Sequence, residues 1–137
     1  MNAQQIKVET KVAAPIDQVW RAYTTPDDIM KWNAASADWH TTRATVDLRE
    51  GGAFSSRMEA KDGSFGFDFA GTYTKIEPQK LIEYDFGDRH AKVEFVTEGD
   101  GVRVIVTFDP ENEYPIEQQR GGWQAILVNF KRHAEAQ

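Results

Sequence analysis

The chain has 137 residues with a formal net charge of −6, and 12% of its residues are aromatic. A net acidic chain is repelled by phosphate backbones and anionic lipid, so we expect neither nucleic acid nor a membrane as a partner. The absence of cysteine excludes disulfides, thiolate nucleophiles and thiolate zinc sites, and fits a reducing cytoplasm. The length is typical of one domain, which we expect to span residues 1–137. The polar N-terminus and the short apolar runs predict neither a signal peptide nor a membrane span, so we expect a cytoplasmic protein.

The N-terminal part of the sequence predicts one strand and two short helices. Residues 4–12 alternate between apolar and charged side chains, as in a half-buried strand. Pro15 suits the first turn of a helix, and Thr25-Pro26 starts a second helix that continues to Trp32. Residues 33–42 are mostly small and polar, so we expect a loop there.

The rest of the sequence predicts a meander of six strands followed by a long helix. The strands are expected near residues 43–49, 52–60, 64–77, 80–87, 89–98 and 101–109. Short turn signals separate them, including Glu50-Gly51-Gly52 and Lys61-Asp62-Gly63. The period becomes helical after Pro115, which predicts a helix over roughly 115–134.

This order of elements predicts an α+β helix-grip fold: a seven-stranded curved antiparallel sheet, two short helices and a long C-terminal helix. The amphipathic last helix must bury its apolar stripe against the concave face of the sheet. Such a sheet has more concave surface than one helix can cover. Either large side chains fill the remainder, or a cavity is left between sheet and helix.

Strand parity predicts which side chains face that space. The inward faces include Phe65, Ser56 and Ile82, and the opposite faces carry charged residues such as Asp68, Glu83 and Arg103. The twelve residues that we predict to bind a ligand are Trp32, Trp39, Phe54, Met58, Phe67, Phe69, Tyr73, Tyr84, Phe95, Val106, Trp123 and Leu127. The alternative is ordinary core packing, and for Trp32 and Trp39 a lid held shut by aromatic burial.

Other chemistry has weak support in the sequence. His40 could act as an acid or base, but a loop histidine is more often simply solvated. The spacing of His90 and His133 predicts no metal site, and we expect no cofactor. Gly121-Gly122 lie at the start of the last helix, where glycine is unfavourable. We interpret them as a close approach of the helix to the sheet or a hinge beside the cavity, or else as a late helix start with glycine as the cap. Trp123 is expected to be largely buried near Phe67 or Phe69.

Several short motifs, in this order, resemble the START-related and Bet v 1-like domains, and most closely the branch similar to the C-terminal domain of the activator of Hsp90 ATPase. They are Ala14-Pro15 through Val19-Trp20, Pro26 to Trp32, Arg49-Glu50-Gly51-Gly52-Ala53-Phe54, Gly71 with Ile76-Glu77-Pro78 and Leu81-Ile82, Gly101-Val102-Arg103-Val104, and Gly122-Trp123 with Leu127. Val102 departs from the threonine that is usual in that branch.

The resemblance implies a fold and a cavity but no particular reaction, because the family includes carriers of hydrophobic ligands, cyclases and hydratases, and stress-response proteins. We expect binding of a small apolar or aromatic ligand. The alternatives are a cyclase-like or hydratase-like enzyme and a co-chaperone-like interaction module. The co-chaperone activates Hsp90 with the help of a separate N-terminal domain, for which this chain has no room, so we do not expect direct Hsp90 activation.

Overall fold

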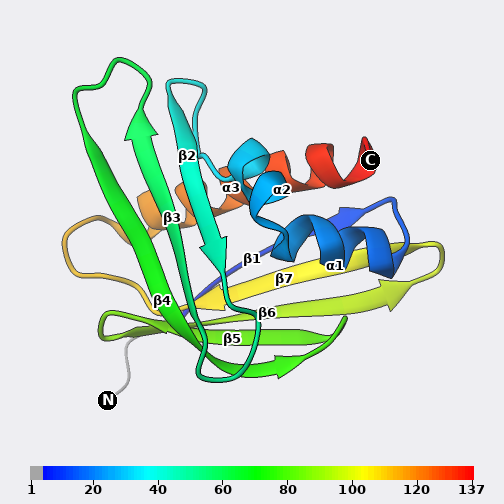
Figure 1. Ribbon diagram of the computed structural model, residues 1–137. Helices are drawn as coiled ribbons and strands as arrows, with labels where there is room; N and C mark the ends of the chain where they lie inside the picture. Colours follow the sequence, from blue (N-terminus) through cyan, green and yellow to red (C-terminus); the bar gives the residue numbers. More distant parts are fainter. Residues whose placement is uncertain (1–4) are drawn as a thin grey trace.

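Seven strands and three helices make up residues 5–137, the part of the chain that the computed structural model describes (Figure 1). In chain order they are β1 (Ile6–Val12), α1 (Ile16–Thr24), α2 (Pro26–Trp32), β2 (Trp39–Val46), β3 (Ala53–Ala60), β4 (Gly66–Glu77), β5 (Leu81–Phe86), β6 (Arg89–Glu98), β7 (Gly101–Phe108) and α3 (Ile116–Glu135). The predicted helix-grip fold and its order of elements are confirmed. Gln4, which we included in the first strand, lies outside the described residues.

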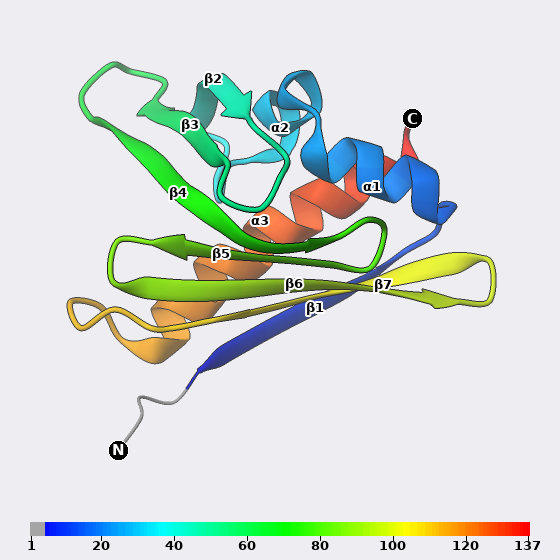
Figure 2. The same ribbon diagram turned by 60° about the horizontal axis from the view of Figure 1, so that its bottom comes forward.

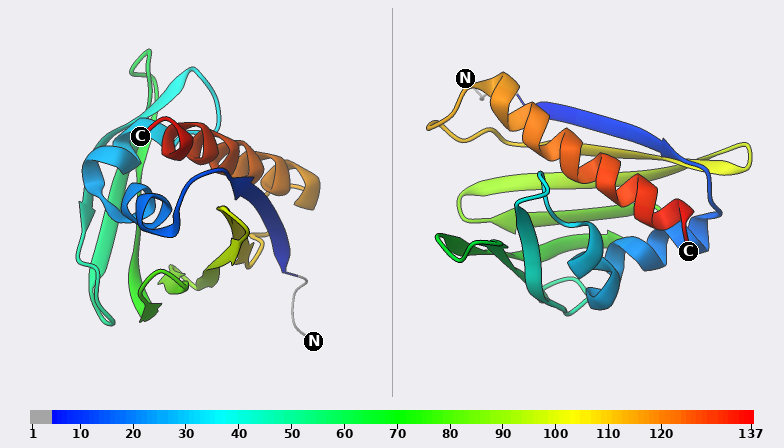
Figure 3. Two further views of the ribbon diagram at one scale, coloured as in Figure 1. Left: turned by 90° about the vertical axis from the view of Figure 1, so that its right-hand side faces the viewer. Right: turned by 90° about the horizontal axis from the view of Figure 1, so that it is seen from above.

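The strands form one antiparallel sheet in the order β1-β7-β6-β5-β4-β3-β2. Strands β2 to β7 pair with their neighbours in sequence, and β1 closes the far edge against β7 with Val8 opposite Val106. The register shifts between Thr41 and Arg43 and between Tyr73 and Lys75, and such irregularities bend a strand. The sheet curls as a result, and α3 crosses its concave side while α1 and α2 lie at one end (Figures 2 and 3).

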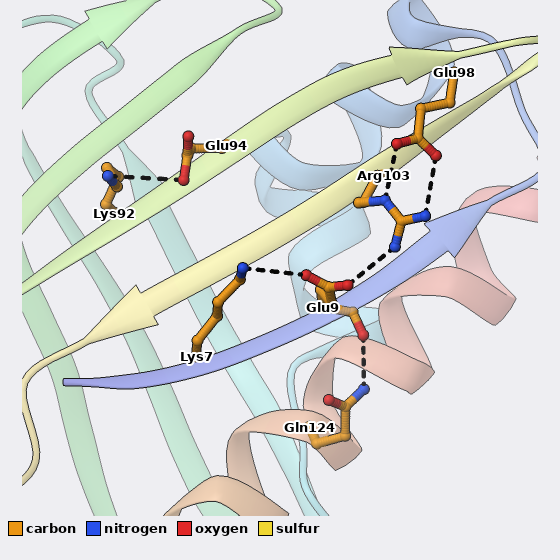
Figure 4. Close-up of polar contacts among 7 residues, drawn as sticks. All are labelled: Lys7, Glu9, Lys92, Glu94, Glu98, Arg103 and Gln124. Atoms are coloured by element: carbon orange, nitrogen blue, oxygen red, sulfur yellow. Dashed lines mark hydrogen bonds and ion pairs between the residues drawn. The ribbon is translucent and has the colours of Figure 1, made fainter.

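The two faces of the sheet differ sharply in polarity. The concave face buries Val104 and Phe108 completely. The outer face of β1, β7 and β6 carries cross-strand ion pairs, in which Arg103 contacts Glu9 at 3.0 Å and Glu98 at 2.9 Å (Figure 4). Exposed pairs of this kind contribute on the order of 0–1 kcal/mol each. They therefore mark the solvent face, and burial on the concave face holds the fold together.

Helix α3 is anchored at several points along its length. Its buried side chains include Leu127 and Phe130, and the Phe130 ring meets Trp32 edge-on at 5.1 Å. Gln124 donates to the backbone carbonyl of Glu9 on β1 (Figure 4). At the C-terminal end, the carboxylate of Glu135 accepts a 2.7 Å hydrogen bond from the backbone N–H of Ala13. The helix is thereby fixed across the open side of the sheet.

Two local predictions are wrong. The loop expected over residues 33–42 ends at Asp38, because Trp39 already pairs with Ala60 of β3, and the strand stops at Val46 rather than at residue 49. Pairing with β3 outweighed the polar composition of this edge strand. Phe65 precedes β4 and is 65% exposed instead of facing the interior, because the β3–β4 end of the sheet extends beyond α3 (Figure 1).

Candidate ligand-binding cavity

A cavity of about 410 Å³ lies between the concave face of the sheet and helix α3. Strands β3, β4 and β5 supply one wall, α3 supplies the opposite wall, and α2 with the following loop covers one end. The volume falls in the range of roughly 300–1,000 Å³ that is typical of small-molecule sites. The space left by the helix in the curved sheet is thus not filled by side chains.

Eleven of the twelve residues predicted to contact a ligand line this cavity. They are Trp32, Trp39, Phe54, Met58, Phe67, Phe69, Tyr73, Tyr84, Val106, Trp123 and Leu127. The exception is Phe95, which is 5% exposed and packs edge-on against Trp20 and Tyr23 of α1. Its inward direction was predicted correctly, but α1 covers that end of β6 and separates Phe95 from the cavity.

Nine further residues line the cavity: Tyr23, Ile29, Asn33, Ala35, Ser36, Ser56, Ile82, Gly122 and Ile126. Most of them come from the helices and from the loop after α2. Ser56 and Ile82 follow from strand parity, which placed them on the inner face. The helical spacing indicates that Tyr23 and Ile29 face inward, but it cannot show which part of the interior they reach.

The aromatic wall depends on a glycine in β4. A Cβ atom added to Gly71 would lie 2.3 Å from the carbonyl oxygen of Asp85 and 2.9 Å from the ring of Phe54. The Phe54 ring therefore rests directly on the backbone of β4, which only glycine permits. From there Phe54 contacts Tyr73 at 5.1 Å and Tyr84 at 4.9 Å between ring centroids. These contacts make one continuous aromatic surface.

Trp123 forms the opposite wall. Its indole stacks on Phe108 with ring centroids 3.8 Å apart and planes inclined by 10°, and it meets Phe69 edge-on at 6.2 Å. The predicted contact with Phe69 is present, but Trp123 is only partly buried because its other side faces the cavity. A Cβ atom at Gly121 or Gly122 would meet nothing within 4 Å, so the expected close approach of α3 to the sheet is wrong.

The lining reaches solvent beside the loop that joins α2 to β2. Ala35 and Ser36 of this loop are exposed, and so is Phe67, which is 42% accessible. Hydrogen bonds fix the start of the loop: the Asn33 carbonyl accepts from Thr41 and the Ala34 carbonyl accepts from Asn129, each at 2.6 Å. This edge is the mouth of the cavity.

Trp32 and Trp39 have different positions at this end. Trp32 is 7% exposed, and its indole N–H donates to the carbonyl of Ala22 at 2.9 Å, so it is part of the fixed wall. Trp39 lies at the mouth, where its ring centroid is 6.0 Å from that of Phe65 and 5.9 Å from that of Phe67. An aromatic side chain at a mouth can stack on an entering ligand.

The acidic, basic and histidine side chains lie elsewhere. The described residues that line the cavity include no Asp, Glu, His, Lys or Arg, and His40 is not among them. His90 is on the outer face of the sheet between Asp85 at 2.6 Å and Glu83 at 2.9 Å, and His133 pairs with Asp28 at 2.7 Å. Within residues 5–137, no group of three or more acidic, His or Cys residues is arranged to hold a metal ion.

Tyrosines are the only titratable groups in the lining. Burial raises the pKa of Tyr73 to about 12 and raises the pKa of Tyr84 well above its usual value. Burial likewise raises the pKa of Tyr23. All three hydroxyls therefore stay protonated at neutral pH, and the cavity carries no charge.

A curved antiparallel sheet that holds a C-terminal helix over an apolar cavity defines the helix-grip class of proteins. Within that class, the chain belongs to the family of Activator of Hsp90 ATPase homolog 1-like proteins, whose model matches residues 13–135. The resemblance noted in the sequence is thereby confirmed. No curated protein sequence matches the chain.

Solved structures agree with this assignment. The chain is 46% identical to an AHSA1-like protein from Aeromonas hydrophila, with a TM-score of 0.91 over 97% of this chain and 93% of that one. It is 45% identical to a protein from Cytophaga hutchinsonii, with a TM-score of 0.83 over 96% and 92% of the two chains. A protein from Chromobacterium violaceum shares the fold at 24% identity, with a TM-score of 0.86 over 96% and 98%. Among the described residues, no helix is both long and apolar enough to cross a membrane.

Proposed function

We propose that this protein binds a small, uncharged and largely apolar molecule in the cavity between the sheet and α3. The observation that carries the proposal is the cavity of about 410 Å³ with an aromatic wall and no charged lining residue. Transfer of apolar surface from water into such a space gains about 25 cal/mol per Å². A charged ligand would lose its hydration without finding a counter-charge.

The same lining favours binding over catalysis. A cyclase or hydratase needs an acid or base within reach of the substrate, with a pKa near the working pH. Here the only titratable groups in the wall are tyrosines whose pKa values are raised by burial. Such groups can donate hydrogen bonds but cannot readily exchange protons near neutral pH.

A co-chaperone-like interaction would use apolar surface outside the cavity. The most exposed large aromatic side chain of the described residues is Phe65, and it lies against Trp39 at the mouth. We assign this aromatic cluster to the entry of the ligand, since it continues the wall of the cavity.

The experiment is a titration with N-phenyl-1-naphthylamine, a neutral fluorophore that brightens in apolar surroundings. Gly122→Leu and Gly121→Leu are matched variants, because an added Cβ atom meets nothing within 4 Å at either position but only Gly122 lines the cavity. We expect saturable binding with one site per chain, weakened at least tenfold in Gly122→Leu and unchanged in Gly121→Leu. Absence of saturable binding, or equal binding by both variants, would overturn the proposal. Native mass spectrometry of freshly purified protein tests in parallel for a bound ligand.

A further inference from the structure

Three tyrosine hydroxyls interrupt the apolar surface of the cavity. Tyr23 comes from α1, whereas Tyr73 and Tyr84 lie opposite each other on β4 and β5. Tyr73 and Tyr84 are each 7% exposed. Tyr84 is near enough to Tyr23 and Tyr73 for both to contribute to its raised pKa, after the larger effect of burial. The three residues thus form a polar group, which we call the tyrosine cluster, within an apolar wall.

The hydroxyls of the tyrosine cluster have no hydrogen-bonding partner among residues 5–137, and no hydrogen bond contributes to their pKa values. Nevertheless, among the described residues every polar side-chain atom that is fully buried has a hydrogen-bonding partner. Each hydroxyl therefore keeps some accessible surface, and all three tyrosines line the cavity. A buried hydroxyl left without any partner costs roughly 1–3 kcal/mol, so water or a ligand group must satisfy it.

A protonated tyrosine is a hydrogen-bond donor directed at whatever occupies the cavity. A carbonyl oxygen is the complementary group, because it accepts up to two hydrogen bonds and carries no charge. A hydrocarbon of the same shape would displace the water that satisfies these hydroxyls and return no hydrogen bond. A carboxylate would accept the hydrogen bonds but would be buried without a cation, since the lining supplies none.

We propose that the tyrosine cluster makes the cavity selective for uncharged aromatic or alicyclic molecules that carry a carbonyl oxygen. This inference rests on the proposed function, and it adds the chemical class of the ligand. Tyr23, Tyr73 and Tyr84 are the residues that determine this selectivity, while the aromatic wall supplies most of the affinity.

The test compares three probes of similar shape: 2-acetonaphthone, 2-ethylnaphthalene and 2-naphthoate. Affinities are measured by quenching of tryptophan emission, since Trp123 and Trp39 line the cavity. We expect the ketone to bind about three- to tenfold more tightly than the hydrocarbon, as for one net hydrogen bond. The carboxylate should bind at least tenfold more weakly than the ketone.

Tyr23→Phe, Tyr73→Phe and Tyr84→Phe, together with the triple variant, should lower the ketone affinity toward that of the hydrocarbon. The affinity for the hydrocarbon should be unchanged or higher. Tyr114→Phe is the control, because Tyr114 is 52% exposed and lies outside the lining. These substitutions should not lower the melting temperature, because the hydroxyls have no protein partner to lose. If a hydroxyl instead made a structural hydrogen bond, its removal would lower the melting temperature.

The outcomes separate the two proposals. If none of the three probes binds, the proposed function fails. If the ketone and the hydrocarbon bind equally, or if the preference for the ketone survives in the triple variant, the cavity binds ligands but the inference from the tyrosine cluster is wrong.

Discussion

Gly121 in helix α3 offers a quantitative test of how the helix is built. The residue lies in the interior of Ile116–Glu135, and a Cβ atom there would meet no other atom within 4 Å. Alanine is more favourable than glycine in a helix interior by about 0.8–1.0 kcal/mol. Gly121→Ala should therefore raise the free energy of unfolding by about 1 kcal/mol, because no contact opposes the gain in helix propensity.

This gain can be converted into a shift of the melting temperature. The entropy of unfolding is about 2.1 cal/mol/K per residue, or about 0.3 kcal/mol/K for a chain of 137 residues. A gain of about 1 kcal/mol then corresponds to a rise of about 3 °C, measurable by circular dichroism or calorimetry. Ligand affinity should not change, since Gly121 is outside the lining. An unchanged or lower melting temperature would refute the reasoning and would support a hinge at this position.

Four further changes should have distinct outcomes. Gly122→Ala should raise the free energy of unfolding in urea by a similar amount, about 1 kcal/mol. The new methyl group enters the cavity, however, and should weaken fluorophore binding; unchanged binding would place Gly122 outside the site. Trp123→Ala should lower the free energy of unfolding by less than the roughly 3–5 kcal/mol lost with a fully packed aromatic side chain, because one side of the indole faces open space. Ligand binding should lose more free energy than folding does; a larger loss in folding would make Trp123 a core residue. Gly71→Ala should destabilise by about 1–3 kcal/mol or more, since the added Cβ would lie 2.3 Å from the Asp85 carbonyl; a neutral effect in thermal unfolding would contradict the Phe54 packing. Hydrogen bonds that the protonated His90 ring donates to Asp85, and then to Glu83, raise the pKa of His90 above its value in the unfolded chain, with desolvation opposing them. This stabilisation is therefore complete below about pH 6.5 and is lost as the pH rises through the folded pKa, so the stability difference from His90→Gln should shrink from pH 5 to pH 8; a constant difference would show that the histidine charge is not involved.

Hydrophobic periodicity predicted the fold well because each face of the sheet has a uniform environment. Alternating residues such as Val104 and Val106 are buried on the concave face, whereas Arg103 lies on the outer face, and this contrast is visible in the sequence. The predicted bounds were wrong for β2, an edge strand whose extent is set by its pairing with β3 rather than by its own sequence pattern. Edge strands bury little surface, so their own pattern is weak.

The cavity wall was predictable from strand parity, but its limits were not. Phe95 and Tyr84 both face inward, yet α1 covers Phe95 and leaves Tyr84 open to the cavity. The angle at which a helix crosses the sheet depends on packing between distant segments, which a periodic pattern does not encode. The open space at Gly122 was missed for the same reason.

The most direct test of the central claim is to record the indole N–H resonances of the four tryptophans by ¹H–¹⁵N NMR during a titration with 2-acetonaphthone. Trp32, Trp39 and Trp123 line the cavity, whereas Trp20 projects from α1 against Phe95 and lies outside it. We predict saturable shifts for Trp39 and Trp123, which face the open part of the cavity, with little change for Trp20. No saturable shift at any indole, or the largest shift at Trp20, would contradict binding between the sheet and α3.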